Sequence, residues 1–307
     1  MGNQLLKLNK EEKEKGMMKS LNKSIVLPAF FPNSMEDTQH FLNVIKIISN
    51  YGISFIEFYY KGNEKKIIRE CLMKYNINSI YLGAMAIKQK GLNLSSHKEK
   101  LRIEAVREMK KCIDDAYFYG SYSILINSGR SSDNGKDEIA YEYLKKSLEE
   151  LLKYIDVSAK DYKLNLTLEP GDTEVDSFSL IGDTDLAIKL VREIRGKYNN
   201  FGLTMDTSHL RQLDEEPLNS IKKTFHYCNH IHLANCIVKD KTSKLYGDKH
   251  PPFGVKNGEF DLKDIKKIYK NICYMYKGHQ LIIALEIICR EINPIEFFSQ
   301  VVEECNW

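Results

Sequence analysis

The sequence lacks any apolar run of the roughly 18 residues that a membrane-spanning helix requires. Its opening segment, MGNQLLKLNKEEKEKGMMKS, also lacks the apolar core of a signal peptide. The seven cysteines are scattered along the chain and form no C-x-x-C pair, so we expect reduced thiols. Together these absences favour a cytoplasmic protein with no membrane partner.

An excess of charge of one sign is absent as well. The 45 lysines and arginines nearly balance the 42 aspartates and glutamates, and the net charge is +3. A nucleic-acid-binding surface usually shows a clustered basic stripe, so the composition gives no support for a nucleic acid partner. Because the opening segment is highly charged, we expect residues 1–22 to form a solvated extension and residues 23–307 one folded domain.

Short runs rich in β-branched and aromatic residues recur along the chain, with longer helical patterns between them. This alternation is typical of βαβ units and a parallel sheet. Eight such runs predict an α/β fold that closes into a single (βα)8 barrel, or TIM barrel. The expected strands are residues 24–30, 53–60, 78–84, 121–127, 163–169, 201–206, 229–234 and 280–286.

An open, doubly wound sheet shares this alternation and is the competing architecture. It normally carries a glycine-rich phosphate turn after an early strand, and LPAFFPNS is not such a turn. In the fifth run, Leu164, Leu166 and Leu168 alternate with small or polar residues, and the sixth run repeats this pattern. We therefore expect bulky apolar side chains to face the helices and small or polar ones to face the barrel interior.

Three segments between the strands carry helix signals. Ser34 precedes Asp37 at the spacing of a helix start in residues 34–50. The helical pattern of residues 95–120 ends on Gly120, and Asn293 followed by Pro294 predicts the start of the last helix.

The carboxyl ends of four predicted strands carry residues that bind metals. Glu169, Asp206 and Glu286 each close a strand, and His232 lies one pleat nearer that end than His230. Three carboxylates in a partly dry cavity repel one another unless a cation neutralises them. The set predicts one divalent ion, Mn²⁺, Mg²⁺, Co²⁺ or Zn²⁺, with positions left for substrate oxygens. Separate solvated strand-end residues without a metal are the alternative.

The order of several short motifs resembles the xylose-isomerase-like barrels. This superfamily includes sugar-phosphate isomerases and epimerases and, more distantly, the endonuclease IV type of nuclease. The matching stretches are LTLEPGDT, GLTMDTSHL, HIHLAN, GDKHPPFG with GVKNGEFDL after it, and IIALE. They cover the second half of the chain, whereas the first half matches only through barrel-like alternation and NSGR.

The resemblance implies that Glu169, Asp206, His232 and Glu286 bind the metal and that His209 points at the substrate. It also implies an isomerase or epimerase acting on a sugar, sugar phosphate or related polyol. In such chemistry the metal polarises a carbonyl and a hydroxyl, the two glutamates move a proton, and the histidine hydrogen-bonds an enediolate.

Asp248 and His250 form a D-x-H pair in the loop YGDKHPPFG. In the nuclease branch the matching pair, with the histidine that matches His209, binds a further metal; substrate or loop positioning is the alternative here. The nuclease histidines after strands three and four are missing, and Asn127 stands where one would be expected. The epimerases commonly place an arginine after the strand-seven histidine, whereas here the next basic residue is Lys239.

Four further residues are candidates for substrate binding. Asn127, Arg130 and Arg290 lie at or just beyond strand ends, where an arginine could hold a phosphate or carboxylate. A solvated loop arginine is the plainer interpretation. Glu57, inside the second strand, could hydrogen-bond the metal ligands or pair with a neighbouring lysine.

Three functions stay open at this point. A metal-dependent isomerase or epimerase with a small sugar-like substrate is favoured. A phosphodiesterase of the endonuclease IV type, acting on abasic DNA, is the second, and a non-catalytic ligand-binding barrel is the third, because fold and function are separable. An oligomer is compatible with each of them.

Overall fold

The computed structural model describes residues 21–131, 137–159, 161–290, 292–305 and 307. The predicted N-terminal extension therefore lies outside the described residues, except for its last two positions, which begin the first strand. Among the described residues, no helix is both long enough and apolar enough to cross a membrane.

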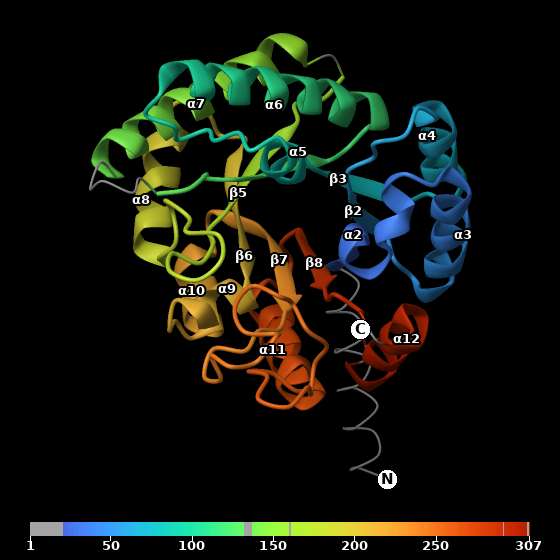
Figure 1. The fold of residues 1–307 in the computed structure, drawn as a ribbon. Helices are drawn as coiled ribbons and strands as arrows, with labels where there is room; N and C mark the ends of the chain where they lie inside the picture. Colours follow the sequence, from blue (N-terminus) through green and yellow to red (C-terminus); the bar gives the residue numbers. More distant parts are fainter. Residues whose placement is uncertain (1–20, 132–136, 160, 291, 306) are drawn as a thin grey trace.

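Eight parallel strands close into a barrel in the order in which they occur along the chain (Figure 1). Parallel pairing of β1 with β8 completes the ring, which confirms the predicted α/β barrel and excludes the open sheet. The strands are β1 (Leu21–Val26), β2 (Phe55–Phe58), β3 (Asn78–Leu82), β4 (Ser123–Asn127), β5 (Asn165–Glu169), β6 (Phe201–Asp206), β7 (Cys228–Ala234) and β8 (Leu281–Glu286).

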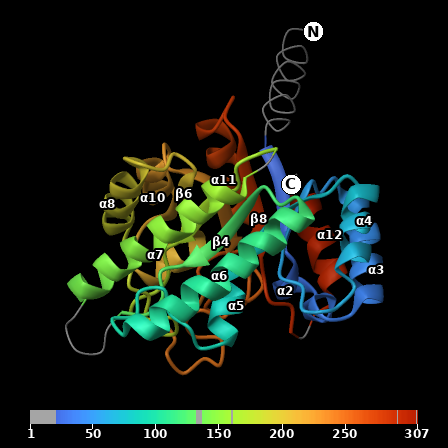
Figure 2. The same ribbon diagram turned by 90° about the horizontal axis from the view of Figure 1, so that it is seen from above.

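Helices surround the barrel on its outside (Figures 1 and 2). The α-helices are α2 (Leu27–Phe30), α3 (Thr38–Ile48), α4 (Lys65–Lys74), α5 (Gly83–Gln89), α6 (Glu99–Tyr119), α7 (Asp137–Ser158), α8 (Thr184–Arg195), α9 (Thr207–Gln212), α10 (Pro217–Thr224), α11 (Leu262–Met275) and α12 (Pro294–Cys305). Two predicted ends are confirmed: Gly120 follows α6 with φ of 71°, and the Asn293 side chain accepts a hydrogen bond from the backbone of Ile295.

Two predicted boundaries near the N-terminus were wrong. The first strand ends at Val26, and α2 begins at the next residue, because Pro28 has no N–H for a strand ladder but fits the first turn of a helix. Ser34 lies in a short 3-10 turn, and the side chain of Asp37 caps α3 by accepting from the backbone N–H of His40.

The barrel interior has a polar side and an apolar side. On β5 to β7 the inward positions hold small or polar residues, as the sequence predicts. For β2 to β4 the prediction was only partly right, because apolar and polar side chains share the inward positions: Glu57 and Asn127 are polar, and other inward residues are bulky and apolar. The apolar interior cluster comprises Val26, Phe55, Ile80, Leu82, Leu125, Ile282 and Ala284. These side chains fill part of a barrel that would otherwise be hollow.

β7 contains a β-bulge, and the residues before and after it face opposite sides of the barrel wall. Leu203 of β6 pairs with Cys228, whereas the next residue, Thr204, pairs with His230, so Asn229 is the extra residue. Cys228 consequently packs in the outer core, while His230 and the residues that follow at alternate positions point into the barrel. The bulge thus sets the face on which the histidines lie.

Candidate metal centre

Four side chains converge at the carboxyl end of the barrel. Glu169, Asp206, His232 and Glu286 each offer a nitrogen or oxygen atom, and these four atoms all lie within 4.8 Å of one another. They come from β5, β6, β7 and β8, which are consecutive around the ring, so a single edge of the barrel supplies the whole set. The structure therefore brings together the four residues that the strand-end pattern singles out.

The Nδ1 atom of His232 is the centre of this group. It lies 2.9 Å from Oε1 of Glu169, 2.7 Å from Oε2 of Glu286 and 3.6 Å from Oδ2 of Asp206. One ring N–H can serve only one of three carboxylates, and His232 Nδ1, Glu169 Oε1 and Asp206 Oδ2 are buried without a hydrogen-bond partner among the described residues. Ligands of a small divalent ion in octahedral geometry lie about 3 Å apart, so the set fits such an ion.

The charges of this group perturb its pKa values strongly. Burial lowers the pKa of His232, but the carboxylates of Glu57, Glu169 and Glu286 outweigh it and raise that pKa well above 6.5. Burial raises the pKa of Asp206, but neighbouring histidines, led by His209, hold it far below its usual range. Without a cation, protons on the histidines balance the carboxylates, and metal ions compete for such positions.

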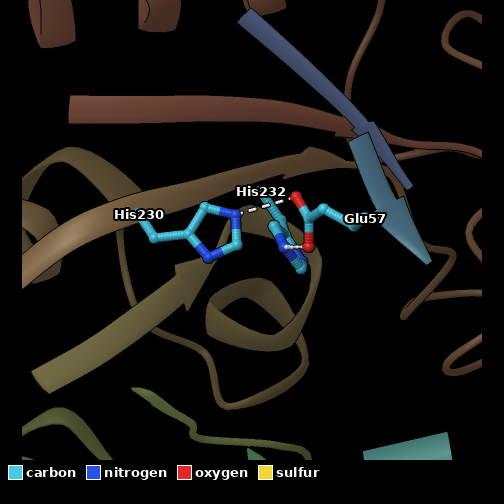
Figure 3. Close-up of side chains that lie close together, drawn as sticks. All are labelled: Glu57, His230 and His232. Atoms are coloured by element: carbon cyan, nitrogen blue, oxygen red, sulfur yellow. Dashed lines mark hydrogen bonds and ion pairs between the residues drawn. The ribbon is translucent and has the colours of Figure 1, made fainter. Parts of the chain in front are cut away.

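Glu57 lies inside the barrel beside His230 and His232 (Figure 3). Its side chain is 0% exposed, and its two oxygens lie 2.8 Å from Nε2 of His230 and 3.0 Å from Nε2 of His232. Burial raises the pKa of Glu57, but the two histidines outweigh that effect and hold it far below its usual range. Two roles were considered for Glu57: a hydrogen bond to a strand-end residue, or a pair with a lysine. The geometry matches the first, because Glu57 contacts His232, one of the four converging residues, on the side away from the open end of the barrel.

A second group of donors adjoins the first. Atoms of Asp206, His209 and His250 lie within 4.8 Å of one another, and Asp248 lies 3.1 Å from His250 and 3.9 Å from Nδ1 of His209. His209 Nδ1 and Asp248 Oδ1 are buried without a hydrogen-bond partner in the described part of the chain. The D-x-H pair therefore faces the same space as the strand-end residues.

Ser208 links the two groups, and sequence reasoning missed it. Its hydroxyl donates to Oδ1 of Asp206 at 2.6 Å and lies 2.9 Å from Nε2 of His250. The sequence offered one sign of this contact: Ser208 comes two residues after Asp206, the strand-end aspartate that caps α9.

The remaining candidates lie at the edge of the site or outside it. Asn127 places Nδ2 at 3.5 Å from Oε2 of Glu169. Arg130 is exposed, with its guanidinium 5.0 Å from the ring centre of Phe178, and Arg290 is exposed as well. Lys239 is the first basic residue after the histidine of β7, where epimerases commonly have an arginine. Its side chain is 79% exposed and lies 3.4 Å from Glu259.

An aspartate that sequence reasoning missed ties two loops together above the barrel. Oδ2 of Asp176, in the loop after β5, accepts from the backbone N–H of Asp248 at 2.7 Å, and Oδ1 lies 2.7 Å from Nζ of Lys249. Gly247 has φ of 84°, and a Cβ there would lie 2.4 Å from Asp176 Oδ2. The close approach therefore requires glycine and fixes the loop that carries Asp248 and His250.

A cavity of about 300 Å³ lies at the other end of the barrel. It is lined by residues at the starts of β5, β6 and β7, including Asn165, Phe201 and Cys228, and by none of the four converging side chains. Active sites of such barrels lie at the carboxyl ends of the strands. The candidate site is therefore the converging group and not this cavity.

Comparison with known proteins gives a family and a fold. The family model described as xylose isomerase-like TIM barrel matches residues 45–303. No curated protein matches the sequence. The solved structure of 3-keto-D-glucoside 4-epimerase from E. coli matches with 12% identity and a TM-score of 0.68, over 94% of this chain and 98% of that chain.

Two other solved structures are similar. A D-tagatose 3-epimerase-like protein shares 17% identity with a TM-score of 0.68, over 93% of this chain and 98% of that one. An AP endonuclease of family 2 from Brucella melitensis shares 14% identity with a TM-score of 0.65, over 91% and 98%. At these identities the likeness shows a common fold.

The thermal stability of the metal-free protein should depend on His209. Burial lowers the pKa of His209, but Asp248 and the other carboxylates outweigh it and raise that pKa from 6.5 to about 9. The folded state then holds a proton that the unfolded state releases, so this stabilisation is complete below pH 6.5 and is lost as the pH rises through about 9.

Calorimetry in the presence of a chelator should therefore show a melting temperature that falls over this pH interval. The slope should be shallower in a His209→Asn variant, in which His232 and His250, whose pKa values are also raised, still contribute. An identical slope in the variant would contradict the protonation assigned to His209.

Replacing Asp176 should loosen the loop after β7 without unfolding the protein. An Asp176→Ala variant loses the bonds to Asp248 and Lys249, and hydrogen exchange in residues 244–252 should become faster. The Asp176–Lys249 ion pair is about 30% exposed, so the free energy of unfolding should change by less than about 1 kcal/mol. Asp156→Ala, which breaks the exposed pair with Lys163, is the matched control and should leave this loop unchanged.

Proposed function

The chain belongs to the xylose isomerase-like TIM barrel family, and from this premise we propose that it is a divalent-metal-dependent isomerase or epimerase of a sugar or related polyol. The observation that carries the proposal is the convergence of three carboxylates and one imidazole whose facing atoms are largely unpartnered and buried. Such a set suits a hard divalent cation with coordination positions left for substrate oxygens.

The two glutamates are proposed to transfer the proton. A bound divalent ion would polarise the carbonyl and hydroxyl oxygens of an open-chain sugar and make the adjacent C–H acidic. Glu169 turns Oε1 and Glu286 turns Oε2 toward His232 Nδ1, so each keeps a second oxygen for another task. Among the described residues, the contacts of those second oxygens are long, at 3.5 Å from Glu169 to Asn127 and from Glu286 to His250.

The proposed reaction needs only these two carboxylates as acid and base. One removes the proton from the carbon next to the carbonyl, and the C–H electron pair moves toward the carbonyl oxygen to give an enediolate. Return of a proton to the opposite face of the same carbon inverts it. Return to the neighbouring carbon moves the carbonyl, provided that the hydroxyl proton of the first carbon passes to the former carbonyl oxygen. Because Glu169 and Glu286 lie on β5 and β8, they approach the substrate from different strands of the barrel.

His209 is proposed to stabilise the negative charge that develops on the substrate oxygen. The residue is 7% exposed, and Nδ1 is one of the buried atoms without a partner among the described residues. A preorganised donor of this kind is worth most in a site from which water is excluded.

A metal-dependent phosphodiesterase is the second candidate, because Asp206, His209 and His250 form a further donor group beside the first. One similar structure is an AP endonuclease of family 2. The residues directly after β3 and at the end of β4, however, include no histidine: β3 continues into α5, GAMAIKQ, and β4 ends at Asn127. A centre with the histidines of the nuclease type is therefore disfavoured.

The metal content of the purified protein separates these candidates. After loading with Mn²⁺ and gel filtration, we expect about one ion per chain by elemental analysis. Glu286→Gln should weaken retention of the ion because it removes a charged ligand, whereas Glu303→Gln, an exposed glutamate on α12, should not. Several ions per chain would favour the phosphodiesterase, and wild-type protein that retains none would remove both.

Solvent exchange tests the chemistry itself. In D₂O, the Mn²⁺-loaded protein should place deuterium on the carbon next to the carbonyl of its substrate. D-tagatose, which the name of one similar structure contains, is the first sugar to test by mass spectrometry. The Glu286→Gln variant should lose at least about 100-fold in the rate of uptake, since it removes the acid–base group. Uptake that is equally fast in this variant would contradict the role given to Glu286.

A further inference from the structure

We propose that Glu57, His230 and Thr204 are positioning residues that hold His232 in the orientation and tautomer required to bind the metal. The inference rests on the proposed function, since it assigns a support to the same metal centre. These residues form a continuous hydrogen-bonded column through the barrel interior, from Thr204 through His230 and Glu57 to His232.

The positions of the hydrogens in this column follow from the chemistry of its members. An ionised carboxylate only accepts hydrogen bonds, so Nε2 of His230 and Nε2 of His232 must both carry hydrogen to bond Glu57. In neutral His232 the lone pair then lies on Nδ1, which is the atom that faces the three strand-end carboxylates. Nδ1 of His230 likewise accepts from the hydroxyl of Thr204 at 3.0 Å.

The surroundings leave the column little freedom. Glu57 and Thr204 are 0% exposed and both histidines are 1% exposed. The two imidazole rings lie 4.6 Å apart with their planes at 81°, so each meets a different oxygen of the carboxylate (Figure 3). A half-turn of the His232 ring would break the bond to Glu57 and turn a carbon toward the metal position.

His230 has a role of its own in this arrangement. Without it, the one hydrogen-bond partner that Oε1 of Glu57 would keep in the described part of the chain is the hydroxyl of Ser24 at 3.3 Å, and an under-satisfied buried carboxylate oxygen is costly. With both histidines in place, each oxygen of Glu57 has an N–H donor. His230 therefore fixes the carboxylate of Glu57, and that carboxylate fixes His232.

Glu57, His230 and His232 also have the composition of a metal site. Their contacts of 2.8 and 3.0 Å are ordinary hydrogen-bond lengths, however, and each is made by a nitrogen that carries hydrogen. The trio is nearly inaccessible, whereas Glu286 of the outer group is 19% exposed on its side chain. The geometry thus favours one metal between the four converging residues, with Glu57 and His230 holding His232 by hydrogen bonds.

The affinity of the full-length protein for Mn²⁺, measured by calorimetric titration, tests this arrangement. A Glu57→Gln amide can accept from one histidine but must donate to the other, so one of the two tautomers has to change. We expect binding of Mn²⁺ to weaken by about 10- to 100-fold, the range for partners of metal-bound histidines. Isomerase or epimerase activity should recover at saturating Mn²⁺, because Glu57 does not touch the substrate. Glu303→Gln is the matched surface control.

Thr204 provides a second test that does not depend on the folding of the Glu57 variant. Thr204→Val removes the hydroxyl at nearly constant shape and should weaken Mn²⁺ binding about two- to fivefold. Thr204→Ser retains the hydroxyl and should bind as the wild type does. In the Zn²⁺-loaded wild type, nitrogen NMR of the histidines should show hydrogen on Nε2 of His232.

The outcomes separate this inference from the function on which it rests. Wild-type protein that binds no Mn²⁺ would overturn the proposed function. Tight binding by the wild type together with unchanged binding by Glu57→Gln, or by Thr204→Val if the former does not fold, would overturn the positioning role alone. A second ion per chain that disappears in Glu57→Gln would identify the trio as a metal site and would also overturn it.

Discussion

The structure depends on how the charge of several carboxylates gathered in one barrel is balanced. Four of them belong to Glu57, Glu169, Asp206 and Glu286. Each buried carboxylate costs several kcal/mol to desolvate unless it is paired. Glu57 obtains its balance from the N–H groups of two histidines, whereas one oxygen of each of the other three faces the same imidazole nitrogen of His232. The excess of acceptors on the outer side is what a cation would balance.

The fold produces this excess through a few local features. The strands β5 to β8, which carry the four converging residues, are consecutive, so these residues meet without help from long loops. The bulge at Asn229 turns His230 and His232 onto the inner face of β7. Apolar side chains from β1 to β4 and β8 fill part of the interior, and Glu57 of β2 reaches the histidines of β7 beside them. Asp176 then holds the loop with Asp248 against the site.

Much of this arrangement could be predicted because it is local. The alternation of strands and helices predicts the barrel, and period-two patterning places Glu169, Asp206 and Glu286 at the ends of their strands, where a barrel gathers its functional residues. The inward position of Glu57 could be suspected from the same pattern. The roles of these residues as metal ligands remain predictions, since their close approach is an observation on side-chain positions and not on a bound ion.

The rest could not be predicted because it depends on contacts between distant segments. Glu57 and His230 are 173 positions apart, and Asp176 and Asp248 are 72 positions apart, so no local pattern relates them. The bulge at Asn229 exists only in the pairing of β6 with β7. The interior of β2 to β4 was misjudged because a half-polar pattern seen on β5 and β6 was extended to strands that pack differently.

The central claim is that the four converging residues bind one divalent ion. Anomalous diffraction from a crystal soaked in Mn²⁺ tests it most directly. We expect one strong peak about 2.1 Å from Nδ1 of His232 and bounded by carboxylate oxygens of the three strand-end residues. A crystal with Mn²⁺ bound elsewhere and no peak at that nitrogen would contradict it.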